Sequence, residues 1–284
     1  MQASELFNQP NTILLDGGMG TMLQAAGMKL GTRPEDLNIE NPELIRSIHA
    51  KYAAAGSRVV NANTFGASPH KLADSKYTLE EVITAGIANC KQAVAPYGAL
   101  VTLDVGPLGE LLEPSGTLAF EDAVAEYGRI VRAGVAAGAD ILYFETFTDL
   151  YEMKAALLAA KENSTLPIMA SMSFEANGRT FTGCTVESFA ATARGLGANA
   201  VGINCSLGPK EIFPMAKRLA EAVPGDFPVF VKPNAGLPRA DGSGYDITPQ
   251  LYAMQMKPYR ELHLFAAGGC CGTTPEFIQM LNGV

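Results

Sequence analysis

The stretch ILYFET, residues 141–146, is followed after three residues by LYEMKAALLAAKEN, residues 150–163. The first part is apolar without alternation, which is typical of a strand that is buried on both faces of a sheet. The second part is alanine-rich and amphipathic, which is typical of a helix packed against such a sheet. Together they predict one strand followed by one covering helix.

The same pattern recurs along the chain. Apolar runs that resemble buried strands occur at residues 12–16, 57–63, 99–106, 141–146, 167–174, 200–206, 228–234 and 262–269. Amphipathic stretches lie between them, for example at residues 41–56, 120–138, 186–197 and 209–223. Eight such units in 284 residues predict an α/β fold with a single (β/α)8 TIM barrel, one domain over residues 1–284. A doubly wound open sheet is the alternative, and the uniform composition disfavours it.

Composition narrows the class of protein further. With 48% hydrophobic and 18% charged residues, the chain can bury a large core. The net charge of −8 disfavours nucleic acid and anionic membranes as partners. We find neither a signal-peptide pattern nor an apolar run of roughly 20 residues, and five cysteines are too few for a disulfide framework. These features predict a cytoplasmic enzyme, in which clustered cysteines bind metal or take part in catalysis.

The apolar runs end in polar residues. Active sites of (β/α)8 barrels lie at the carboxyl ends of the strands, so these side chains are expected to face one site. They are Asp16, Asn61, Asn63, Asp104, Glu145, Asn204, Cys205, Lys232, Asn234, Cys270 and Cys271.

Three of these residues are cysteines that the barrel would bring together. Cys205 ends the sixth run, and Cys270 and Cys271 end the eighth within GGCCG, whose glycines allow the backbone to turn. Three thiolates with an open fourth position are a catalytic zinc arrangement. The alternative is three inert buried cysteines.

A thiolate-rich zinc site suits a thiol substrate better than water. The chain has three histidines, His49, His70 and His263, without HExxH or a pair at helical spacing, so hydrolysis by zinc-bound water is disfavoured. A thiol entering the open position would lose its proton at neutral pH and become a nucleophile.

Seven stretches carry a resemblance to a known family. They are LLDGGMGTML, VVNANTFGAS, DVGPLGELLEP, FETFTDLYE, GINCSLGP, VKPNAG and GGCCGTTPE, within Thr12 to Phe277. They resemble the homocysteine-binding barrel of the homocysteine S-methyltransferase family, particularly the N-terminal module of cobalamin-dependent methionine synthase. The pairing of GINC with GGCCG is the most specific part of the resemblance.

The resemblance implies roles for the polar strand ends. Zinc would be held by the three cysteines, with the sulfur of homocysteine as the incoming ligand. Asp16 and Glu145 would bind the homocysteine ammonium, and the N–H groups of Gly17 and Gly18 would receive its carboxylate. Asn234 would either supply an oxygen to zinc before the substrate arrives or shape its loop.

The resemblance also implies a methyl transfer that gives methionine. The donor is expected to be a methylcorrinoid, because the resemblance to the methionine synthase module is greatest in GPLGELLEP and GINCSLGP. The corrinoid would be held by a partner domain or protein, because the cobalamin-binding D-x-H-x-x-G signature is absent from this chain. A stand-alone enzyme that uses S-methylmethionine or another small onium donor is one alternative. A homocysteine-binding module without turnover of its own is a second. A third is an aldolase-like barrel with a Schiff base on Lys232, although a buried salt bridge at the rim is the simpler role for that lysine.

Overall fold

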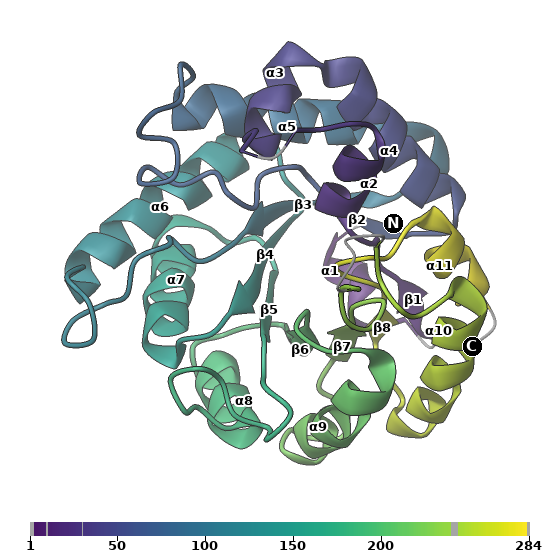
Figure 1. Cartoon of the computed structure of the whole chain (residues 1–284). Coiled ribbons are helices and arrows are strands. Elements are labelled where there is room, and N and C mark those ends of the chain that lie inside the picture. The colour runs from purple at the N-terminus through teal and green to yellow at the C-terminus, as the bar shows by residue number, and fades with distance from the viewer. Residues whose placement is uncertain (1–2, 10, 30, 240–243, 283–284) are drawn as a thin grey trace.

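The computed structural model describes residues 3–9, 11–29, 31–239 and 244–282. Eight parallel strands lie at the centre of the molecule, and helices form a ring around them (Figure 1). The strands are β1 Ile13–Leu14, β2 Val59–Asn61, β3 Leu100–Val105, β4 Ile141–Phe147, β5 Ile168–Met172, β6 Ala200–Asn204, β7 Val229–Lys232 and β8 Ala266–Ala267.

The sheet closes on itself. Its order is β1-β8-β7-β6-β5-β4-β3-β2, so β1 and β2 lie at its two ends. A parallel bridge between Leu15 and Val59 joins these ends, and the N–H of Arg58 donates to the carbonyl of Leu14 at 2.7 Å. The predicted (β/α)8 barrel is therefore confirmed, and the open sheet is wrong.

Helices follow the strands as the sequence pattern predicts. They are α1 Ala3–Leu6, α2 Met19–Ala25, α3 Leu37–Glu40, α4 Pro42–Ala54, α5 Leu79–Val94, α6 Phe120–Ala136, α7 Leu150–Asn163, α8 Val186–Gly195, α9 Pro209–Glu221, α10 Pro249–Met256 and α11 Pro275–Met280, with 3-10 helices η1 Pro34–Asp36, η2 Ala95–Tyr97 and η3 Lys257–Leu262. Within the described ranges, none of these helices is long and apolar enough to cross a membrane.

Alternate residues of each strand belong to two separate apolar cores. Ile141 and Tyr143 of β4 pack inside the barrel, whereas Leu142 and Phe144 pack under the surrounding helices. The fully buried side chain of Leu6, on α1, joins the inner core at the amino end of the barrel. The prediction that these runs are buried on both faces is confirmed.

The last predicted strand is much shorter than its apolar run. Only Ala266 and Ala267 form β8, because η3 continues to Leu262 and His263 then adopts a left-handed φ of 48°. The expectation that His263 lies inside the last strand is therefore wrong. His49, on α4, is completely buried, and burial lowers its pKa to about 3.

Candidate active site

A cavity of about 350 Å³ lies at the carboxyl ends of the strands. Its wall contains most of the polar strand ends that the sequence singled out: Asp16, Asn61, Asn63, Asp104, Glu145, Cys205, Lys232, Cys270 and Cys271. Glu35 of η1 and Tyr245, from the loop between β7 and α10, also line the cavity, together with Thr21, Gln24 and Thr146. The barrel therefore brings these residues to one site, as the fold predicts.

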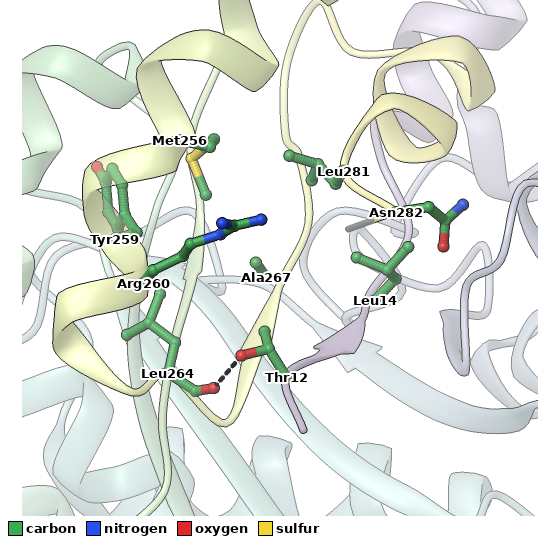
Figure 2. A pocket seen from close by; sticks show the side chains of 9 residues that line it. All are labelled: Thr12, Leu14, Met256, Tyr259, Arg260, Leu264, Ala267, Leu281 and Asn282. Carbon is green, nitrogen blue, oxygen red and sulfur yellow. Dashed lines mark hydrogen bonds between the residues drawn. The ribbon is translucent and has the colours of Figure 1, made fainter. Parts of the chain in front are cut away.

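A second, smaller hollow lies between β1, β8 and the helices α10 and α11 (Figure 2). Its volume is about 110 Å³, and Leu14, Met256, Leu264 and Leu281 make much of its wall apolar. None of the cysteines or carboxyl residues of the larger cavity line this hollow, so we assign the candidate active site to the larger cavity.

The three cysteines converge as predicted. Their sulfur atoms all lie within 4.8 Å of one another, and Cys205 Sγ is 3.7 Å from Cys271 Sγ. Tetrahedral zinc with Zn–S bonds of about 2.3 Å would hold its sulfurs about 3.8 Å apart. The cluster therefore fits a metal ion of this kind.

Unusual backbone conformations aim the sulfurs at one point. Cys205 and Ser206 have left-handed φ angles of 64° and 61° directly after β6, which turns the chain out of strand geometry. After β8, Gly272 has a φ of 79°, and a Cβ added at Gly269 would lie 2.4 Å from Thr273 Oγ1. Only glycine fits such a close approach, so the predicted turn at GGCCG is confirmed.

The thiols share their protons unequally. Hydrogen bonds from the Cys205 and Cys270 thiols lower the pKa of Cys271. The hydrogen bonds of Cys270 with Cys205 and Cys271 raise the pKa of Cys270. The hydroxyl of Tyr245 also lowers the pKa of Cys271. Without metal, the cluster therefore favours one thiolate held by thiol donors, and a bound cation would replace the remaining protons.

Asn204 has a role that its place at a strand end did not predict. Its Oδ1 accepts hydrogen bonds from the Thr146 N–H at 2.9 Å and from Ser171 Oγ at 2.8 Å. Its Nδ2 donates to Thr146 Oγ1 at 2.7 Å and faces Cys270 Sγ at 3.8 Å. The amide thereby ties Cys270 to Thr146, whose φ of 66° is also left-handed. No motif marks this role, because its partners lie far apart in the chain.

Exchanging Asn204 for aspartate should weaken metal binding roughly 10- to 100-fold, because Cys270, a proposed metal ligand, loses the hydrogen bond from the Asn204 amide. Asn204→Asp keeps the shape and the acceptors but puts a carboxylate beside the thiols. Competition with a chelator measures the affinity. Asn199→Asp is the matched control, because Asn199 lies at the other end of β6 and caps the N–H of Ile168. Equal affinity in wild type and Asn204→Asp would show that the amide does not support the cluster.

Lys232 forms a buried salt bridge rather than standing free. Its Nζ lies 2.9 Å from Asp16 Oδ1 and 3.5 Å from Glu145 Oε2. Burial alone would lower the pKa of Lys232, but the Asp16 and Glu145 carboxylates raise it above its usual value. A Schiff base needs a neutral amine, so the aldolase-like alternative is disfavoured and the simpler role is confirmed.

Gly17, Gly18 and Asn234 are the other residues that the resemblance assigned to substrate or zinc binding. Gly17 and Gly18 line the cavity, but the Gly18 N–H already donates to Thr273 Oγ1 at 3.2 Å. Asn234 Oδ1 accepts from the Cys271 N–H at 3.0 Å, which is the loop-shaping role.

Fold and site together define a (β/α)8 barrel whose cavity combines a thiol cluster able to hold a metal with a buried carboxylate and lysine network. The model of one family, homocysteine S-methyltransferase, matches residues 13–284. The chain belongs to this family, as its sequence motifs predict.

Named relatives agree with this assignment. Methionine synthase of Mycobacterium tuberculosis (strain ATCC 25618 / H37Rv) is 30% identical over 285 residues, which is 93% of this chain and 24% of that protein. Methionine synthase of Mycobacterium leprae (strain TN) is 30% identical over 93% of this chain and 23% of its own length. The chain thus spans less than a quarter of these relatives. The homocysteine methyltransferase MmuM from Escherichia coli, in its oxidized form, matches with a TM-score of 0.85 and 25% identity, covering 99% of this chain and 98% of that one.

Proposed function

We propose that the protein is a zinc-dependent methyltransferase that moves a methyl group to the thiolate of homocysteine and so forms methionine. One observation carries the proposal. The thiols of Cys205, Cys270 and Cys271 share a single cavity with the carboxyls of Asp16 and Glu145. The cavity thus offers a site for sulfur and a site for an ammonium group.

The cysteines would hold the metal in this function. Zinc on three thiolates supplies an open position in which a substrate thiol loses its proton at neutral pH. Asn204 keeps the Cys270 sulfur in place through its amide. Asn234 fixes the backbone of Cys271 by accepting a hydrogen bond from its N–H. Such outer contacts matter because a bound metal requires its ligand sulfurs to stay in fixed positions.

The carboxylates would bind and orient the amino-acid end of the substrate. When both are ionised, Asp16 and Glu145 carry two negative charges against the one positive charge of Lys232. An ammonium group would balance the remaining charge. Gly17 is the better of the two glycines to receive the substrate carboxylate, because the N–H of Gly18 is already hydrogen-bonded. Fixing both ends of the molecule aligns the sulfur with the incoming methyl group.

A methylcorrinoid on a partner domain or protein is the donor that we favour. The methionine synthases that this chain resembles are more than four times its length, so they have room for further domains. Large apolar side chains also stand exposed on loops that follow the carboxyl ends of the strands, among them Phe181 at 73% and Leu237 at 55% exposure. Such side chains suit a docking surface around the cavity. The match to MmuM covers 98% of that chain, so a stand-alone enzyme with a small onium donor is the second candidate.

Methionine formation with a panel of donors tests this function. We expect slow turnover with free methylcobalamin and much faster turnover with a methylated corrinoid protein, because docking aligns the reactants. The double variant Phe181→Ser, Leu237→Ser should slow only the reaction with the corrinoid protein. Turnover with S-methylmethionine and none with any methylcorrinoid would assign the onium donor instead. Homocysteine binding without methionine from any donor would identify a binding module.

A further inference from the structure

Tyr245 lies in the wall of the cavity but has no part in the proposed function. It belongs to the loop between β7 and α10, in which it forms an antiparallel bridge with Pro238. The Leu237 N–H donates to Asp246 Oδ1 at 2.8 Å, and the Asp246 N–H donates to the Leu237 carbonyl at 3.2 Å. These contacts pair the two arms of the loop, so the position of Tyr245 at the cavity is fixed.

The segment that follows β7 contacts all three polar groups of Cys271. The Cys271 N–H donates to Asn234 Oδ1 at 3.0 Å, and the Cys271 carbonyl accepts from the Ala235 N–H at 2.9 Å. The Tyr245 hydroxyl donates to the Cys271 sulfur. Partial burial and the neighbouring Cys271 raise the pKa of Tyr245 to about 12, so the hydroxyl keeps its proton at neutral pH and can act as this donor. The segment therefore fixes both the backbone and the sulfur of Cys271.

The ring of Tyr245 makes a separate contact at the same turn. A Cβ added at Gly272 would lie 2.3 Å from Tyr245 Cγ, so the ring packs directly on this glycine. Gly272 has a left-handed φ of 79° and belongs to the turn that presents Cys271. The two contacts can be tested separately, because phenylalanine at position 245 keeps the ring and removes only the hydroxyl.

We propose that Tyr245 is a positioning residue of the metal site, whose hydroxyl donates to the Cys271 sulfur and thereby raises the affinity of the bound metal for the thiolate of the substrate. The physical reason is the charge on the sulfur. A thiolate that accepts a hydrogen bond donates less charge to the metal, which then attracts an incoming thiolate more strongly. The inference rests on the proposed function, in which homocysteine binds through its sulfur.

The absorption spectrum of the cobalt-loaded protein tests the hydrogen bond without substrate or turnover. Co(II) in place of zinc absorbs light by charge transfer from its thiolate ligands. Tyr245→Phe should shift this band to longer wavelength, because a sulfur without the hydrogen bond gives up an electron more easily. Tyr259→Phe is the matched control and should leave the band unchanged, because Tyr259 lines the smaller hollow (Figure 2) and its hydroxyl donates to the Pro209 carbonyl.

Ligand affinities of the zinc-loaded protein test the consequence for the substrate. Homocysteine offers a thiolate, whereas methionine has the same amino-acid end but only a thioether, which is a much weaker ligand. Tyr245→Phe should weaken homocysteine binding roughly 10-fold and change methionine binding less than about twofold. Calorimetry measures both affinities, and Tyr259→Phe should change neither.

An unshifted cobalt band in Tyr245→Phe would overturn the inference. Equal weakening of homocysteine and methionine would also overturn it, since the hydroxyl would then only support the cavity. Neither result contradicts the proposed function, which the wild-type protein tests by itself. If the wild-type protein binds metal but no homocysteine, the proposed function is wrong and the effect on the substrate is wrong with it, while the cobalt band still decides whether Tyr245 donates to the sulfur. If it binds neither zinc nor cobalt, both proposals are wrong.

Discussion

Replacing Cys205 with alanine is expected to abolish tight zinc binding and methionine formation, and Cys270→Ala and Cys271→Ala should each do the same. The three sulfurs lie within 4.8 Å of one another, and the residues that the structure describes offer no fourth cysteine or histidine to this group. Losing a residue that only hydrogen-bonds to a metal ligand can reduce the zinc affinity roughly 100-fold. Losing one of the three ligands themselves should reduce the zinc affinity by more than this.

Zinc content by elemental analysis and affinity by chelator competition measure this effect. Cys184→Ala is the matched control, because Cys184 is half-buried in the loop before α8 and donates weakly to the Thr185 carbonyl instead of joining the cluster. It should retain full zinc and activity. Stoichiometric zinc in any of the three cluster variants would remove that cysteine from the site.

Replacing Lys232 with methionine is expected to lower the free energy of unfolding by about 3–5 kcal/mol, the cost of removing one partner from a buried ion pair. Methionine fills a similar volume, but it leaves Asp16 and Glu145 without their counter-ion in a cavity wall where both are buried. Homocysteine binding should weaken as well, because the carboxylates lose the lysine that holds them in place.

The loss in Lys232→Met should depend on pH in a defined direction. Burial already raises the pKa of Glu145 above 4.5, and removing Lys232 raises it further. A carboxyl with a raised folded pKa is protonated more easily in the native state, so the folded protein loses stability as pH rises from the unfolded pKa to the folded one. The difference from wild type should therefore be small near pH 4.5 and grow toward neutral pH.

Urea unfolding at several pH values measures this difference. Lys91→Met is the control, because Lys91 pairs with Asp140 at 3.0 Å with both side chains partly exposed. Its loss should cost about 1 kcal/mol or less. A pH-independent loss in Lys232→Met, or one no larger than in the control, would mean that the lysine does not balance the buried carboxylates.

Local sequence patterns were sufficient to predict the barrel and the convergence of its cysteines. The alternation of buried strand and amphipathic helix depends only on neighbouring residues, as ILYFET and the helix after it show. Parallel strands of a barrel all end at one rim, so Cys205 and Cys270 could be predicted to meet although they are 65 residues apart. The prediction failed at His263, because its apolar run reads as a strand while the chain there ends a 3-10 helix.

The sequence by itself determined the fold, the rim on which the site lies and the kinds of chemical group that the site contains. Only the tertiary structure decided how those groups are paired: Lys232 with Asp16, Asn204 with Thr146, and the Gly18 N–H with Thr273. It also left Asp104 Oδ1 without a hydrogen-bond partner among the described residues. The physical reason is distance along the chain. Strand and helix patterns repeat over a few residues, whereas these pairings depend on strand register and turn geometry across the whole barrel.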